Sequence, residues 1–149
     1  MNKIKYPFSY REYKSIYSKV PRLAVELVIR SGDETLFILR RNYGWEGLWH
    51  IPGATLYYGE TIAHCLVRTA REELGVDVKI RKFLGYNEYP SERKERGFGT
   101  SVGLIFFCTI SPKNREILLK REDIRFFKKL PNNIVSEQKL FLRKKLKMR

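Results

Sequence analysis

Hydrophobic and polar residues alternate along this chain in two patterns, one typical of helices and the other of strands. Near the N-terminus, apolar side chains are spaced three or four residues apart: Tyr10, Tyr13, Ile16, Tyr17 and Val20. This spacing predicts an amphipathic helix over residues 9–19, which Pro21 ends. Residues 23–29 and 36–40 have the β-branched and aliphatic character of strands, and a Gly-Asp turn joins them.

The second half of the pattern predicts the rest of a mixed α/β domain. A long helical pattern covers residues 61–74, and Gly75 follows it as the C-terminal cap. Strand-like runs cover 76–86 and 101–110, with a charged loop at residues 91–96 between them.

The chain closes with a short strand at 124–127 and a basic amphipathic helix at 134–147. We see no internal repeat and no domain linker, so residues 1–149 are expected to form a single domain.

Composition excludes several classes of protein. An apolar content of 43% over 149 residues is too high for wholesale disorder. No apolar run approaches the roughly 20 residues that a membrane span needs, and the charged N-terminus does not resemble a secretory signal. The two cysteines, Cys65 and Cys108, show no metal-ligand spacing and cannot form a disulfide framework. We therefore expect no membrane partner and a reducing, cytoplasmic location.

The charge balance is the unusual bulk property, with 30 basic and 16 acidic residues and a net charge of +14. Such an excess attracts anions. Much of it lies near the C-terminus, at Arg143, Lys144, Lys145, Lys147 and Arg149. Two interpretations stay open: cations that stabilise the C-terminal end of a helix, or a weak nucleic-acid contact through the basic C-terminus.

The helix predicted at 61–74 carries the candidate chemistry. At 100° per residue one narrow stripe of it is apolar: Ala63, Leu66, Val67, Ala70 and Leu74. The pattern places Cys65, Thr69, Glu72 and Glu73 on the other side. Two adjacent glutamates form either a solvated acidic surface or a site for a hard cation such as Mg²⁺, which prefers oxygen ligands.

The surrounding motif decides between these two interpretations. The chain reads Gly-Ala-Thr-Leu-Tyr-Tyr-Gly-Glu from Gly53, then seven residues, then Arg-Thr-Ala-Arg-Glu-Glu-Leu-Gly-Val up to Val76. It resembles the Nudix box, which has a glycine, five residues, a glutamate, seven residues and then Arg-Glu-U-X-Glu-Glu-X-Gly-U, where U is aliphatic. The residues in register are Glu60, Arg68, Ala70, Glu72, Glu73, Gly75 and Val76. The resemblance over 53–76 implies a Nudix-type α/β/α sandwich with a mixed β-sheet.

The same resemblance implies a metal-dependent hydrolase whose substrate is a nucleotide derivative. It assigns Mg²⁺, with Mn²⁺ as an alternative, to Gly53, Glu60, Glu72 and Glu73, and it makes Glu72 and Glu73 catalytic as well. Two positions depart from the family pattern. Ala54 replaces the first glycine of the box, and Thr69 replaces a glutamate. Threonine supplies neither a charged oxygen nor a base near neutral pH, so in-line attack on phosphorus is in doubt.

Beyond the box, the chain is most similar to the GDP-mannose mannosyl hydrolase branch of the family. In that branch water attacks the sugar carbon, so the predicted substrate is a nucleotide sugar such as GDP-mannose. The resemblance implies that Arg40 assists catalysis and binds phosphate and that Glu26 contacts the sugar; the alternative is that both are ordinary strand charges. The branch has a histidine base just before the strand at 124–127. This chain has Glu122 near that position, and we take it as a candidate catalytic residue.

Trp45, in a glycine-containing loop, is the expected stacking residue for a base or sugar. Two other functions remain open. One is a pyrophosphohydrolase of nucleoside triphosphates or dinucleotides, and the other is a catalytically impaired Nudix-fold module that binds RNA. The oligomeric state also stays open, with a homodimer as one option.

Overall fold

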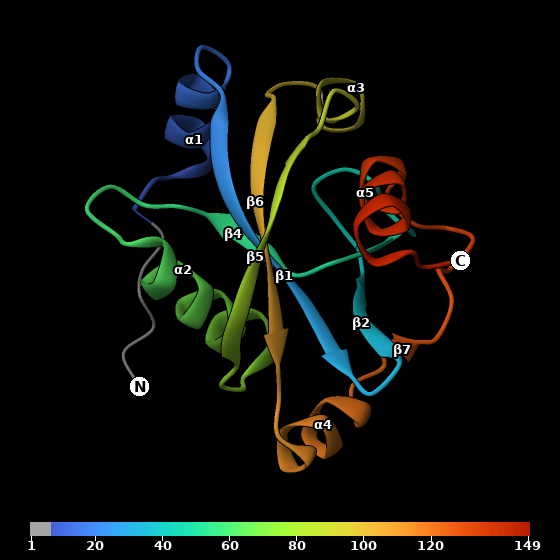
Figure 1. The fold of residues 1–149 in the computed structure, drawn as a ribbon. Helices are drawn as coiled ribbons and strands as arrows, with labels where there is room; N and C mark the ends of the chain where they lie inside the picture. The colour runs from blue at the N-terminus through green and yellow to red at the C-terminus, as the bar shows by residue number, and fades with distance from the viewer. Residues whose placement is uncertain (1–6) are drawn as a thin grey trace.

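The computed structural model describes residues 7–149. Its centre is a seven-stranded sheet whose main path runs β3–β2–β1–β6–β5, while β4 pairs with β1 and β7 with β2 (Figure 1). The strands are β1 (Arg22–Ser31), β2 (Glu34–Leu39), β3 (Trp49–His50), β4 (Gly53–Thr55), β5 (Lys79–Glu88), β6 (Ser101–Thr109) and β7 (Ile124–Phe127). Strands β1 and β6 are parallel and the other pairs antiparallel, so the predicted mixed sheet is confirmed.

Helical segments surround this sheet and sit at both of its ends. They are α1 (Tyr10–Tyr17), α2 (Ile62–Thr69), the π-helical segment η1 (Ala70–Leu74), α3 (Glu92–Arg96), α4 (Pro112–Leu119) and α5 (Ser136–Leu146). In Figure 1, α1 and α3 lie at one end of the sheet and α4 at the other. Among residues 7–149, no helix combines the length and apolar character needed to span a bilayer.

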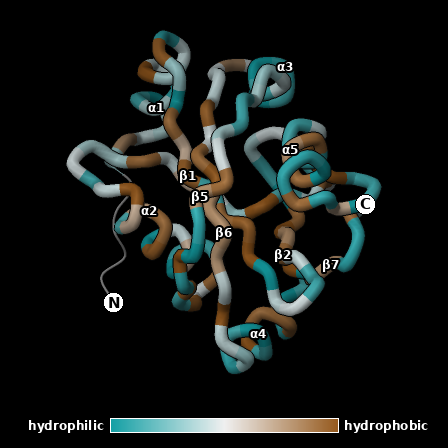
Figure 2. Tube along the Cα trace, viewed as in Figure 1, coloured by the Kyte–Doolittle hydropathy of each residue, from teal (hydrophilic) through white to brown (hydrophobic). Residues whose placement is uncertain are grey.

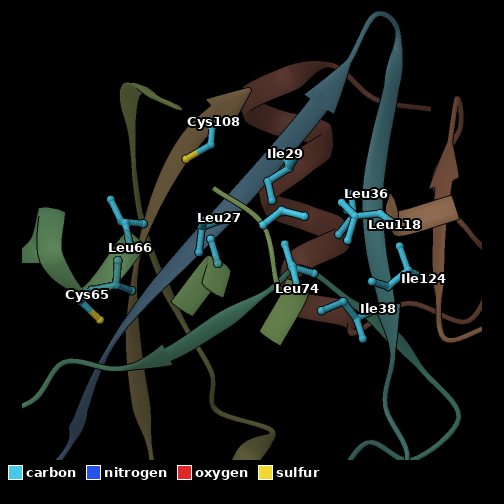
Figure 3. Packing of buried hydrophobic residues seen from close by; sticks show 13 residues of the cluster. Leu27, Ile29, Leu36, Ile38, Cys65, Leu66, Leu74, Cys108, Leu118 and Ile124 are labelled. Carbon is cyan, nitrogen blue, oxygen red and sulfur yellow. The ribbon is translucent and has the colours of Figure 1, made fainter. Parts of the chain in front are cut away.

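Alternation along β1 divides the core into two layers, because successive side chains of a strand point to opposite faces. Val25, Leu27 and Ile29 pack with α4 and with the continuous helix that α2 and η1 form, which we call the box helix. Val28 packs with α5 on the other face. Figure 3 shows Leu27 and Ile29 of β1 among the side chains of the first layer. Figure 2 shows hydrophobic residues along the central strands and hydrophilic ones over much of α4 and α5. Helices therefore cover both faces, as an α/β/α sandwich requires.

Most predicted elements are present, with shifts of one to three residues at their ends. The helix predicted at 9–19 is α1, which Ser9 and Glu12 begin with a reciprocal capping box. The strand predicted at 124–127 has the predicted limits. The prediction of a loop at 91–96 is wrong, since most of this segment forms α3.

Helix α4 was not predicted either, although its start carries clear local signals. Ser111 caps it by accepting a hydrogen bond from the Asn114 amide, and Pro112 occupies its first turn. Its apolar residues follow no clear helical stripe, and only Leu118 is fully buried among them.

The packing side of the box helix contains Leu66, Ala70 and Leu74 of the predicted stripe but is broader than that stripe. Cys65 and Thr69 are fully buried in the first core layer, whereas Ala63 is exposed. Ala63, Cys65 and Thr69 all lie in α2, before the helix changes from α to π geometry at Ala70. The Thr69 hydroxyl donates to the Cys65 carbonyl at 2.7 Å, so this buried polar group is satisfied within the helix.

We predict that Thr69→Glu destabilises the protein by more than about 3 kcal/mol, because it would place an unpaired carboxylate in an apolar layer. Thr69→Ser keeps the hydrogen bond to Cys65 and should cost only about 1 kcal/mol for the lost methyl. Urea unfolding followed by circular dichroism measures both. Equal stability of the two variants would mean that the side chain at this position reaches solvent.

Candidate active site

A single cavity of about 710 Å³ gathers most of the residues singled out in the sequence. This volume lies in the range of pockets that enclose small organic ligands. Its wall contains an unusual number of guanidinium groups, from Arg22, Arg40, Arg41, Arg68 and Arg96. Carboxylates also line it, from Glu26, Glu72, Glu73, Glu92 and Asp123. Charged groups of both signs in one concave surface suit an anionic ligand that binds together with a cation.

Arg68 organises the box. Its guanidinium is almost fully buried, and it binds Glu60 through two contacts, Nε to Oε2 at 2.6 Å and Nη2 to Oε1 at 2.9 Å. It also donates to the Thr55 carbonyl at 2.8 Å and to Glu72 at 3.1 Å. Its charged carbon lies 3.8 Å from the centre of the Tyr57 ring. The loop before the helix and the helix itself are thus held by one side chain.

Glu60 is turned toward this arginine and is not part of the cavity wall. Both of its oxygens accept from Arg68, and Oε1 also accepts from the Tyr57 amide at 3.1 Å. Burial raises the pKa of Glu60, but the hydrogen bonds from Arg68 and Tyr57 outweigh it and leave the pKa below its usual value. The structure gives Glu60 a role in shaping the box, and it does not line the cavity as Gly53, Glu72 and Glu73 do.

Glu72 and Glu73 line the cavity together with Gly53. Burial raises the pKa of Glu73 to about 7, although Arg40 and Arg121 act in the opposite direction. A buried carboxylate that its neighbours neutralise so incompletely fits a site for a divalent cation. Within residues 7–149, no group of three or more His, Cys, Asp or Glu side chains could hold a metal on its own. A cation bound here would take further ligands from carbonyl groups, water and substrate.

Arg40 lines the cavity, but much of its hydrogen-bonding capacity is used by the loop that follows it. Its Nε donates to the Gly44 carbonyl at 2.8 Å, and Nη2 donates to the carbonyls of Tyr43 and Asn42 at 3.1 and 3.4 Å. Burial, followed by the charge of Arg96, lowers the pKa of Arg40. Arg40, the predicted phosphate-binding residue, therefore also holds the backbone of residues 42–44 in place.

Trp45 is also in the wall, although only 8% of its surface is exposed. Its indole nitrogen donates to the Ser91 hydroxyl at 3.1 Å, and its ring meets Tyr89 edge-on with centroids 6.4 Å apart. Arg40 lies 5.3 Å from the ring centre. Trp45 is thus packed into the wall of the cavity, which leaves little of the ring available for a ligand to stack on.

Glu26 is a buried carboxylate in the wall of the cavity. It is 5% exposed and accepts hydrogen bonds from the Tyr89 hydroxyl, at 2.6 Å to Oε2, and from Gln138 at 3.0 Å. Gln138 also accepts from the Ile51 amide at 2.8 Å, so α5 is tied to the sheet here. A Cβ at position 103 would overlap the Glu26 carboxylate, and glycine leaves the room that this side chain needs. Burial raises the pKa of Glu26 to about 7.

Glu122, the candidate base, is separated from these residues. It is exposed and lines a different surface depression, next to Arg115 and Arg125. The following residue, Asp123, reaches the cavity instead. Arg121 holds it with a 2.8 Å ion pair and lowers its pKa.

Sequence reasoning missed Asp123, Tyr89 and Gln138. Asp123 lies beside Glu122 in the turn before β7, and no local pattern distinguishes the two carboxylates. Tyr89 and Gln138 reach Glu26 from 63 and 112 residues away in the sequence, and no local pattern marks such contacts.

Comparisons with known proteins agree with this architecture. The family model described as NUDIX domain matches residues 20–147. The low-salt glycan biosynthesis protein Agl8 of Haloferax volcanii is 42% identical over 119 residues, which span 78% of this chain and 76% of that protein. An ADP-ribose pyrophosphatase of Methanocaldococcus jannaschii is 33% identical over 85 residues, 57% of this chain and half of that protein's length.

Among solved structures, a MutT NUDIX hydrolase from Burkholderia pseudomallei superposes with a TM-score of 0.67. The match covers 83% of this chain and 97% of that one, at 20% identity, so it establishes the similarity of the fold alone.

The Glu26 environment predicts a specific pH dependence of stability. Its pKa is about 7 when folded and 4.5 in its reference state, so between these values the unfolded chain loses this proton and the folded chain keeps it. The stabilisation present below pH 4.5 is then lost as pH rises through about 7. Relative to Glu26→Gln, the wild type should lose roughly 3 kcal/mol of unfolding free energy across this window.

Urea titrations at pH 4.5, 6 and 8 measure the difference. Glu88→Gln, which changes an exposed carboxylate on β5, is the matched control and should follow the wild type. Parallel pH profiles for the wild type and Glu26→Gln would contradict the assignment.

Proposed function

This chain belongs to the NUDIX domain family and is a Nudix hydrolase, and from that premise we propose that it hydrolyses a nucleoside diphosphate sugar. The observation that carries the proposal is the composition of one cavity wall. The Glu72–Glu73 pair, several arginines and the hydrogen-bonded carboxylate of Glu26 all line it. The arginines suit a diphosphate directly, and the glutamate pair suits it through a bound cation. The Glu26 carboxylate suits a group rich in hydroxyls. The name of the Haloferax relative, a glycan biosynthesis protein, supports a substrate that contains a sugar.

The diphosphate of such a substrate is best placed against the arginine-rich part of the wall. Arg22 and Arg96 are already paired with Glu92, at 3.7 and 3.3 Å, and Arg68 is saturated by Glu60 and Glu72. Arg41 is exposed at the cavity, and Arg40 lies beside Glu73 closely enough to influence its pKa. We assign the direct phosphate contacts to Arg40 and Arg41.

We assign Mg²⁺, or Mn²⁺ in its place, to Glu72, Glu73 and the carbonyl of Gly53. When bound, the cation would neutralise charge on the diphosphate and so favour its departure from the sugar. Glu26, held by Tyr89 and Gln138, would accept a hydrogen bond from a sugar hydroxyl and fix the orientation of the ring. Asp123 takes the role first considered for Glu122. Arg121 lowers its pKa, so it is charged at neutral pH and a weak base, and it would act by accepting a hydrogen bond from the attacking water and orienting it.

A second candidate is hydrolysis of a phosphoanhydride, as the name of the Methanocaldococcus relative suggests. The burial of Thr69 argues against it for this chain, because the position that carries a glutamate in the family pattern faces the core here.

We predict that incubation with Mg²⁺ and a panel of GDP-mannose, other nucleotide sugars, ADP-ribose and nucleoside triphosphates yields free sugar and nucleoside diphosphate from a nucleotide sugar. Carbon attack in ¹⁸O-labelled water places the label in the sugar. Label in phosphate would favour the anhydride reaction instead. Turnover of none of the panel, by a chain that still binds nucleic acid, would favour the binding-module alternative.

The metal assignment predicts that Glu73→Gln lowers kcat roughly 100-fold or more, because several kcal/mol of charge stabilisation would be lost. Steady-state kinetics and Mg²⁺ calorimetry on the same variant measure the two effects together. Glu116→Gln changes an exposed carboxylate of α4 and is the matched control. Unchanged Mg²⁺ affinity in Glu73→Gln would remove this residue from the metal site.

A further inference from the structure

Residues 43–45 form a backbone conformation that ordinary side chains rarely adopt. Tyr43, Gly44 and Trp45 have φ values of 59°, 88° and 54°. Glycine is needed in the middle, because its φ is positive and a Cβ there would lie only 3.2 Å from the Glu95 backbone. Such a conformation costs energy for tyrosine and tryptophan, and it persists only where the surroundings impose it.

Two arginines impose it at Tyr43. Nη2 of Arg40 donates to the Tyr43 carbonyl at 3.1 Å, and Nε of Arg96 donates to the same oxygen at 3.3 Å. The result is a tyrosine that lines the cavity while 64% of its surface stays exposed. Burial of the ring therefore does not hold the loop in this conformation, and the two arginine contacts to the Tyr43 carbonyl do.

A second tyrosine reaches the same place from the N-terminal helix. Tyr10 is the first residue of α1, lines the cavity and is 59% exposed. Its ring meets the buried ring of Phe98 edge-on, with centroids 6.3 Å apart. Tyr13, one turn later, contacts Phe98 as well and accepts a hydrogen bond from Arg96 at 2.8 Å. Arg96 thus links the supports of both tyrosines.

The two exposed rings lie together, with centroids 6.3 Å apart and planes inclined by 31°. We propose that Tyr10 and Tyr43 form the subsite for the nucleobase of the substrate, an inference that rests on the proposed function. The ring planes are close enough to parallel for one flat heterocycle to contact both by offset stacking. The pair is exposed, whereas the hydrogen-bonding group assigned to the sugar, Glu26, is buried.

This assignment moves the stacking role away from Trp45. That ring is packed between Arg40 and Tyr89 and is 8% exposed, so it offers a ligand far less surface than either tyrosine. A base on the tyrosine pair would leave the diphosphate beside Arg40, which holds the Tyr43 carbonyl and lines the same cavity.

Calorimetry of the full-length chain with GDP, and separately with inorganic pyrophosphate, tests the subsite. Removing a stacking ring weakens binding of a base by about 10-fold or more. Tyr10→Ala and Tyr43→Ala should therefore each raise the Kd for GDP by about that factor. Both should leave the Kd for pyrophosphate unchanged, because it has no base. Tyr10→Phe and Tyr43→Phe keep the aromatic faces and should bind GDP like the wild type.

Tyr58→Ala is the matched control, since Tyr58 is fully exposed and lies outside the cavity wall. Circular dichroism and an unchanged pyrophosphate Kd show that a variant remains folded with its anion site intact. The inference is overturned if GDP affinity survives in both alanine variants, if pyrophosphate affinity falls equally, or if the wild type binds GDP no better than pyrophosphate.

Two further outcomes separate this inference from the proposed function. If the alanine variants raise the KM of a nucleotide sugar but not the Kd of GDP, the tyrosines contact the sugar and the base subsite is wrong. If they weaken GDP binding while no nucleotide sugar is ever cleaved, the base subsite stands and the proposed reaction fails.

Discussion

The buried guanidinium of Arg68 is the group on which the candidate active site depends. It joins Glu60 of the loop, Glu72 of the helix and the carbonyl of Thr55 at the end of β4. A buried charge that loses one partner costs about 3–5 kcal/mol, so these three segments are constrained to keep one arrangement. That constraint leaves Glu73 facing the cavity, where burial and not pairing sets its properties. The box therefore acts as a small rigid unit. Glu60 and Arg68 serve mainly to hold Glu72 and Glu73 in position.

How far the sequence predicts this structure depends on how far apart in the chain the interacting residues lie. The strands and the box register follow from local periodicity and turn residues, and they are found close to where they were expected. Thr69 was placed on the wrong side because the predicted stripe was drawn from apolar residues alone, whereas this threonine is buried with its hydroxyl satisfied by the Cys65 carbonyl. Helix α3 escaped prediction because it has no apolar stripe. Its buried residue, Glu92, is satisfied by Arg22, Arg96 and Ser101, which no pattern within the helix reveals.

The same difference between local and distant contacts explains which site residues the sequence predicted. The sequence predicted Arg40, Trp45 and Glu26 as site residues, and the structure places all three in the cavity wall. Their partners could not be read from the sequence. Arg40 supports backbone carbonyls, and Glu26 depends on Tyr89 and Gln138 from distant segments. The count of 30 basic residues also overstates the number of cations free to bind a ligand, since several cavity arginines already bind carboxylates.

The close approach of Gly103 to Glu26 has a consequence for how this protein can diverge. Because any side chain at position 103 would occupy the space of the carboxylate, the two positions cannot vary independently. A lineage that gained an alanine on β6 first would displace Glu26 and lose the polar cluster at once. A lineage that first shortened residue 26 would open room on β6 for larger residues, and return would then require two coordinated changes. Only descendants that retain glycine at position 103 and glutamate at position 26 together keep this wall of the pocket, because either order of change removes the carboxylate from it.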